Sequence, residues 1–164
     1  MENWNYYRIV RDILENEEFQ KTKDIVHHGH TRYEHCLRVS LVSYYVSKVL
    51  HLNVKEVTRA ALLHDFFLED NLEITKKKRA KLLVNHPKKA LENASKYFEL
   101  SDIEKDIILT HMFPVAPRVP RYIESWIVDL IDDLVAVYEK AYVVRNELST
   151  AMCFILFVLF NYGR

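Results

Sequence analysis

The sequence predicts an all-α fold, a bundle of about seven or eight helices in a single domain over residues 1–164. The chain holds only 2 glycines and 4 prolines among 164 residues, where average usage would give roughly 20. A β-sandwich or barrel needs repeated tight turns, many of them with the positive φ angles that glycine supplies, so both are nearly excluded. Capping signals and apolar residues at helical spacing support the helices directly.

Charge and cysteine content indicate a cytoplasmic globular protein. The 23 basic and 23 acidic residues cancel, and 49% of residues are hydrophobic, which argues against a nucleic-acid partner and against disorder. Cys36 and Cys153 both lie in apolar helical patterns, as expected of buried thiols in a reducing compartment. The longest apolar run, 151–160, is about half a membrane span. We expect it to be core first and an oligomer contact, as in a homodimer, second.

The first half of the chain predicts three main helices. Residues 4–19 carry apolar side chains at helical spacing, and a loop rich in histidine and lysine follows them. Thr31 and Glu34 form a capping-box signal that opens a helix to about residue 50. Asn53 gives a similar capping signal, which predicts the next helix over 53–64.

The second half adds helices that carry histidines. Pro87 predicts a helix start, with His86 at the N-terminal edge. Ser101 and Glu104 form another capping box. In the helix that follows, Ile103, Ile107 and His111 are spaced four residues apart, so His111 is expected to point inward.

Three prolines between residues 114 and 120 predict a stiff, extended connection, a candidate lid or rim that carries Arg118 and Arg121. The pattern after it predicts a long core helix over 122–146. A last, apolar helix is expected over 149–162.

Nearly every predicted helix delivers an imidazole or a carboxylate from an otherwise apolar segment. A buried ionised group stays inside a protein when it is paired or bound to metal, so one cation would explain the set economically. The ligands are imidazoles and carboxylates without thiolate, which favours Fe or Mn, with Co, Ni, Zn and Mg as further options. The residues concerned are His35, His64, Asp65, His86, His111 and Asp132.

The order His35, His64-Asp65 and Asp132 resembles the HD-domain superfamily of metal-dependent phosphohydrolases, which is all-α and is named for that dipeptide. The stretches TRYEH, ALLHDFF and HMFP carry the resemblance, which covers about residues 25–145 and is strongest to short bacterial members. It implies an HD-type bundle.

The resemblance also implies a ligand set for one or two divalent ions. His35, His64, Asp65 and Asp132 would hold the first ion. His86 and His111 would hold a second, with Asp65 bridging the two. Two departures limit the resemblance: Leu68 stands where one-metal nucleotidases of the superfamily carry a Glu, and Met112 stands where cyclic-dinucleotide phosphodiesterases carry a second His.

Three aspartates in the 122–146 helix compete for the last ligand position. Asp129 lies one turn before Asp132 on nearly the same face, so it is either a supporting partner or the ligand itself. Asp133 is turned about 100° round the helix and is expected to be exposed.

The residues around the ligands offer candidates for catalysis and substrate binding. Asp65 would act as the bridging catalytic carboxylate, and Glu34 either only closes its capping box or activates water. The basic stretch between Lys76 and Lys89 is expected to be a solvated face. Candidate phosphate ligands are Arg32, Lys88, Arg118 and Arg121.

These observations favour a phosphohydrolase that acts on a small phosphorylated substrate, with nucleotides as the expected class from the resemblance. The near-zero net charge argues against a long polyanion. A metal- or nucleotide-binding signalling module without turnover, and a structural helical domain, are the alternatives.

Overall fold

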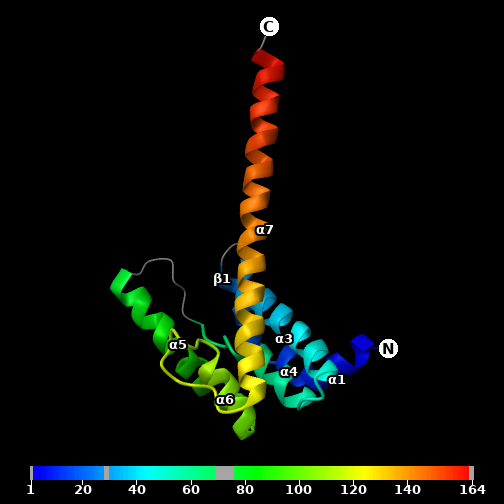
Figure 1. Cartoon of the computed structure of the whole chain (residues 1–164), viewed down its shortest axis with the longest axis vertical. Helices are drawn as coiled ribbons and strands as arrows, with labels where there is room; N and C mark the ends of the chain where they lie inside the picture. Colours follow the sequence, from blue (N-terminus) through cyan, green and yellow to red (C-terminus); the bar gives the residue numbers. More distant parts are fainter. Residues whose placement is uncertain (1, 28–29, 69–75, 163–164) are drawn as a thin grey trace.

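The computed structural model describes residues 2–27, 30–68 and 76–162, and it is an all-α bundle, as predicted (Figure 1). The described part of the chain contains two short helical turns and six longer helices. The short ones are α2 (Glu17–Gln20) and the 3₁₀ turn η1 (Lys21–Asp24). The long ones are α1 (Glu2–Leu14), α3 (Arg32–Val49), α4 (Val54–Leu63), α5 (Lys76–Tyr97), α6 (Asp102–Thr110) and α7 (Ile123–Tyr162).

The loop predicted before α3 contains a small antiparallel ribbon. Its strands are β1 (Val26–His27) and β2 (His30–Thr31), and Val26 pairs with Thr31. The backbone N–H of Arg32 donates to the carbonyl of Ile25 at 2.8 Å, which ties the start of α3 to this ribbon.

Helix α4 is the centre of the core. It packs against α1, α3, α6 and α7, and every residue from Val57 to Phe67 is buried. Apolar side chains therefore surround the end of α4, which is where the His64-Asp65 pair emerges.

Two of the three predicted caps are confirmed. Thr31 and Ser101 both form complete capping boxes. Asn53 precedes α4 but makes no side-chain cap; its amide donates instead to Glu124 on α7 at 2.8 Å. The expected 4–19 helix is also divided, because Asn16 accepts a hydrogen bond from the N–H of Phe19 and opens α2.

The prediction that a helix starts at Pro87 is wrong. Helix α5 begins at Lys76 and runs through Pro87, which places His86 in the helix interior. A proline in a helix interior removes one intrahelical hydrogen bond and its ring crowds the carbonyl four residues earlier, but the buried residues Ala90 and Ala94 anchor the helix to the core beyond it.

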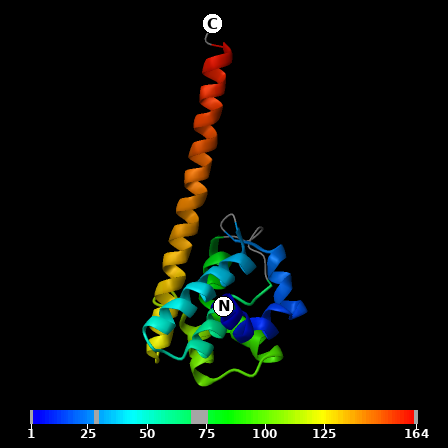
Figure 2. The ribbon, with the colours of Figure 1, turned by 90° about the vertical axis from the view of Figure 1, so that its right-hand side faces the viewer.

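The break predicted between residues 146 and 149 is also absent. Helix α7 runs unbroken for 40 residues, because no glycine or proline occurs between Arg121 and Tyr162. Its first half lies along the bundle, and its second half stands clear of it in both views (Figures 1 and 2). Within the described residues, no helix is long and apolar enough to cross a membrane.

Candidate metal centre

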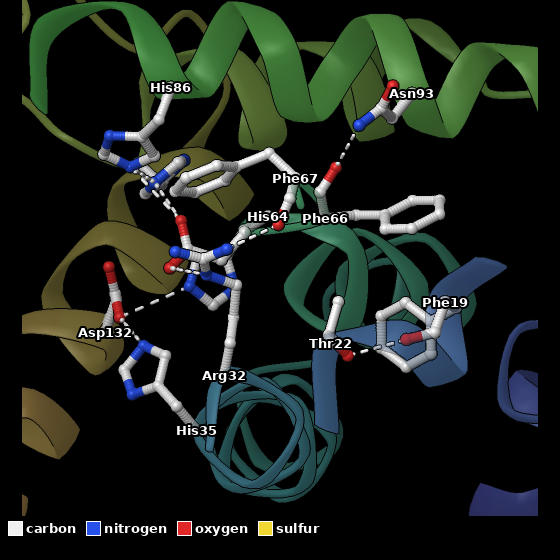
Figure 3. A network of polar contacts seen from close by, with 12 residues as sticks. Phe19, Thr22, Arg32, His35, His64, Phe66, Phe67, His86, Asn93 and Asp132 are labelled. Carbon is white, nitrogen blue, oxygen red and sulfur yellow. Dashed lines mark hydrogen bonds and ion pairs between the residues drawn. The ribbon is translucent and has the colours of Figure 1, made fainter. Parts of the chain in front are cut away.

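Five helical segments bring imidazoles and carboxylates together in the bundle interior (Figure 3). Helices α3, α5 and α7 each contribute one residue, while the ends of α4 and α6 contribute the others. All of them are buried, with at most 8% of any residue exposed. This donor cluster consists of the six residues predicted as ligands, namely His35, His64, Asp65, His86, His111 and Asp132.

One side of the donor cluster gathers around Asp132. Its Oδ1 lies 2.8 Å from His35 Nε2 and 3.5 Å from His64 Nε2. The three ligand atoms are close enough together to hold one metal ion.

The other side gathers around Asp65. Its Oδ1 lies 3.2 Å from His86 Nε2 and 3.6 Å from His111 Nε2. His64, Asp65 and His111 form a second group that could hold a metal ion. Since His64 belongs to both groups, the two sides of the donor cluster are adjacent.

Two of the histidines are held by backbone carbonyls so that Nε2 faces the donor cluster. His64 Nδ1 lies 2.7 Å from the carbonyl of Ala61, and His111 Nδ1 lies 2.8 Å from the carbonyl of Ile108. Each carbonyl is three residues earlier, at the C-terminal end of its helix, where carbonyls lack intrahelical partners. A neutral imidazole that donates through Nδ1 presents a lone pair on Nε2, the form that ligates metals.

The buried polar atoms fit a cation. Neither His64 Nε2 nor Asp65 Oδ1 makes a hydrogen bond of ordinary geometry to another described residue, although both atoms are buried. His86 Nε2 and His111 Nε2 face each other at 2.9 Å. Buried donors and acceptors are normally paired, and a shared positive ion would satisfy these lone pairs together.

The electrostatics agree with a site for positive charge. Burial raises the pKa of Asp65 and Asp132, but the imidazoles beside them outweigh burial and hold both pKa values below the usual range. Burial lowers the pKa of His35, but its hydrogen bonds to Asp132 and Glu139 raise that pKa to about 10. Both carboxylates are therefore ionised and available to a cation at neutral pH.

Glu139 is a site residue that the sequence analysis missed. It is 1% exposed, and its Oε2 lies 3.0 Å from His35 Nδ1. Arg38 donates to its other oxygen at 2.6 Å. Glu139 lies seven residues after Asp132, two turns along the same face of α7, and this spacing is the signal that could have identified it.

Arg32 is the predicted phosphate ligand that the structure brings to the donor cluster. The side chain is 1% exposed, and its Nε lies 3.9 Å from Asp65 Oδ2. The guanidinium stacks on Phe67 with 3.6 Å to the ring centroid and donates to the Phe67 carbonyl. Arg32 thus places a fixed positive charge beside Asp65.

The other predicted catalytic and substrate-binding residues lie apart from the donor cluster, judged by the contacts of the described residues. Glu34 is half exposed, and it accepts the Thr31 N–H in the capping box at 2.9 Å. Lys88 is exposed beside Glu92. Arg118 is exposed, and Arg121 pairs with Asp106 at 2.9 Å.

The three aspartates of α7 are now separated by geometry. Asp132 contacts His35 and His64. Asp129 is buried without a hydrogen bond at Oδ1, and burial together with the charge of Asp133 raises its pKa to about 7. Asp133 is exposed, as predicted.

Comparison with known proteins gives one family. The family model for the HD domain matches residues 32–137, a span that contains all six residues of the donor cluster. No curated protein and no solved structure matches the chain. The matched span covers more than half of the sequence and carries the His-Asp pair at the end of a buried helix, so the chain belongs to the HD-domain family.

Proposed function

We propose that this protein is a metal-dependent phosphohydrolase that acts on a small phosphorylated substrate. The observation that carries the proposal is the pair of adjacent donor groups on either side of His64, each with Nε2 atoms directed inward by hydrogen bonds at Nδ1. Most members of the HD-domain family are hydrolases, and the donor atoms are those that divalent ions use in such enzymes.

Two ions would divide the donor cluster between them. His35, His64, Asp65 and Asp132 would hold one, and Asp65, His86 and His111 would hold the other. A carboxylate has two oxygens and can serve two ions at once, whereas an imidazole Nε2 serves one. Asp65 would therefore bridge. The ligand types favour Fe or Mn.

Bound divalent ions would lower the pKa of a coordinated water and neutralise charge on phosphoryl oxygens. The chain's own residues prepare the site for this chemistry. Ala61, Ile108 and Glu139 fix the imidazoles that carry the donors, and Arg32 holds a positive charge against Asp65. The burial of the donor cluster strengthens each of these electrostatic interactions.

The expected substrate class is a nucleotide or another small phosphorylated metabolite. Arg32 would orient the phosphate, with Lys88, Arg118 and Arg121 as outer candidates whose side chains lie away from the donor cluster. Glu34 is the weakest candidate for water activation, because its carboxylate already closes the capping box.

A matched pair of variants on α7 tests the proposal. Asp132→Asn removes a charged ligand, while Asp133→Asn changes the neighbouring exposed aspartate in the same way. We expect metal content per chain and hydrolysis of a panel of phosphomonoesters and nucleotides to fall in Asp132→Asn and to stay near wild type in Asp133→Asn. Elemental mass spectrometry and phosphate release give the two readings.

Each result of that experiment has a defined meaning. Metal bound without hydrolysis of any panel member would favour the signalling-module alternative. Absence of metal after reconstitution with Fe, Mn, Co, Ni and Zn would contradict the proposal and leave the donor cluster as a structural network.

A further inference from the structure

Helix α7 has two apolar faces, and only one of them is covered. The face toward the bundle carries Val128, Asp132, Val135 and Glu139, all buried. The opposite face is exposed wherever its side chains are described, from Ile123 to Met152. Its side chains, between 42% and 66% exposed, are Ile123, Trp126, Leu130, Leu134, Val137, Tyr138, Val144, Leu148 and Met152.

This outer face of α7 has the size of a protein interface. Side chains of this kind and exposure present roughly 100 Å² each, so together they offer roughly 900 Å². A standard interface buries about 800 Å² on each partner, and the largest apolar patch of a monomer is typically about 300–600 Å². The outer face therefore exceeds what a monomer usually exposes.

The second half of α7 has little contact with the bundle among its described side chains, the ring contact of Tyr142 with His30 being near its start. Beyond Glu139 none of the described side chains is buried, and this half stands clear of the bundle in both views (Figures 1 and 2). It extends about 35 Å at 1.5 Å per residue. Helices in water draw most of their stability from packing of an apolar face, so a partner is needed along this length.

The outer face follows a heptad pattern. Apolar residues recur at alternate spacings of three and four, the arrangement of a and d positions in a coiled coil. The pattern continues in the sequence to Ala151 and Ile155. The positions up to there are Leu130, Leu134, Val137, Ala141, Val144 and Leu148.

We propose that the outer face of α7 pairs with the same face of a second copy of this chain, antiparallel, about a two-fold axis between Tyr142 and Val143. That point is the midpoint of α7 (Ile123–Tyr162), so both helices overlap along their full length. The projecting half of each copy then covers the outer face above the other copy's bundle. Such an interface is isologous and closes as a dimer.

The register about this axis places apolar residues opposite each other in every layer. Ala141 meets Val144 of the second copy, and Val137 meets Leu148. The next layers, by sequence position, join Leu134 to Ala151 and Leu130 to Ile155. Small residues oppose larger ones in two of these layers, which allows close approach of the helices.

The flanking charges favour the antiparallel direction. In a parallel pair, the g and e positions would set Lys140 against Arg145 of the second copy, two like charges. In the antiparallel register, the sequence positions set Lys140 against Glu147 and Tyr138 against Arg145. The pair of Tyr138 and Arg145 suits a cation–π contact between the two copies. Arg145 makes a contact of this kind with Tyr142 of its own chain.

The first test is the mass of the full chain in solution, measured by light scattering at tens of micromolar. We expect twice the mass of one chain. Leu148→Asp should raise the dissociation constant at least about a hundredfold, because each dimer would bury two unpaired carboxylates. Ser149→Asp is the matched control, since residue 149 is exposed but lies off the outer face, and it should remain dimeric.

A cysteine pair then tests the direction of the helices. In a Cys153→Ser background, Val137→Cys with Leu148→Cys should cross-link two chains under oxidised glutathione. Neither single cysteine should do so, because positions 148 and 148 would lie about 16 Å apart in the antiparallel register.

The outcomes separate the alternatives. A monomer at these concentrations, or a dimer that Leu148→Asp leaves intact, would overturn the proposal. Cross-linking by single Leu148→Cys would show a parallel pair and overturn the direction. A monomer that sediments with vesicles of phosphatidylcholine and phosphatidylserine would assign the outer face to a lipid surface instead.

Discussion

Asp65 and Asp106 are two carboxylates buried to the same degree, at 5% and 4% exposed, yet their surroundings differ. Asp106 on α6 accepts hydrogen bonds from the Arg121 backbone N–H at 2.9 Å, from Arg121 Nε at 2.9 Å and from Ser125 Oγ at 2.8 Å. Asp65 at the end of α4 faces imidazoles, and its Oδ1 makes no hydrogen bond of ordinary geometry to a described residue.

Under the proposed function, this difference separates a structural carboxylate from a metal ligand. The chain satisfies Asp106 completely with donors from the segment that enters α7, so this residue fixes where α7 begins. Asp65 has the Arg32 guanidinium at 3.9 Å from Oδ2 and imidazole nitrogens around Oδ1, and a positive ion would satisfy Oδ1 and the imidazole lone pairs together. Burial of a charge is thus ambiguous by itself, and the donors around it decide its role.

Removing Asp65 and removing Asp106 should have different effects, the first on metal and turnover and the second on stability. We expect Asp65→Ala to lower turnover of the best panel substrate by at least about a thousandfold, because the proposed bridging ligand is lost. Asp106→Ala should keep its metal content while losing stability. Elemental analysis beside phosphate release measures both effects, and an Asp65→Ala protein with full metal and turnover would contradict the assignment.

Removing bound metal should lower the thermal stability of the protein through the donor cluster. We expect an excess of chelator to lower the thermal midpoint of protein purified with metal by about 5–10 °C, since a ligand at a hundred times its dissociation constant adds about 2.7 kcal/mol to the free energy of unfolding. Calorimetry with and without chelator measures the shift. His64→Ala should show no such shift, because His64 belongs to both donor groups.

A substitution of Glu139 tests how far metal binding depends on residues that hold the histidines in place. Glu139→Ala removes the acceptor that fixes His35 Nδ1, and we expect metal affinity to fall by about 10–100-fold. Competition with a chromogenic chelator measures the affinity. Arg38→Ala is the comparison variant, because it removes the partner of the other Glu139 oxygen and leaves the contact with His35 Nδ1 in place; an equal loss of affinity there would show a general destabilisation.

Asp106 should govern stability in acid. Burial raises the pKa of Asp106, but its hydrogen bonds to Arg121 outweigh burial and hold the pKa below its ordinary value of 3.8. The stabilisation is therefore fully present above that value and is lost as the pH falls below it toward the lower pKa of the folded state. We expect Asp106→Asn to lower the free energy of unfolding by about 1–3 kcal/mol at pH 7 and by less near pH 3.

Urea unfolding at the two pH values checks the sign. Asp102→Asn on the same helix is the control, because its side chain is 83% exposed and it should change little. A deficit in Asp106→Asn that grows on acidification would be the opposite of what the ion pair requires.

Local signals in the sequence were sufficient for most of the helices and for choosing the six candidate donors, which the structure brings together in the bundle interior. The capping boxes at Thr31 and Ser101 lie where the side-chain pattern placed them, because a cap is a contact between residues three apart. The helix breaks expected near Pro87 and Ser149 were wrong, since continuation there depends on packing and on the absence of a competing stop signal.

The sequence by itself determined the all-α class, the two capping boxes and the list of six candidate donors, because each depends on residue type and short spacing. The tertiary structure decided which donors meet, that Asp132 rather than Asp129 contacts the histidines, and that Glu139 supports His35 across 104 positions. Periodicity tells which face of a helix is apolar, but not which other helix packs against it. Contacts between distant segments arise only when the whole chain packs, so they could not be inferred from local pattern.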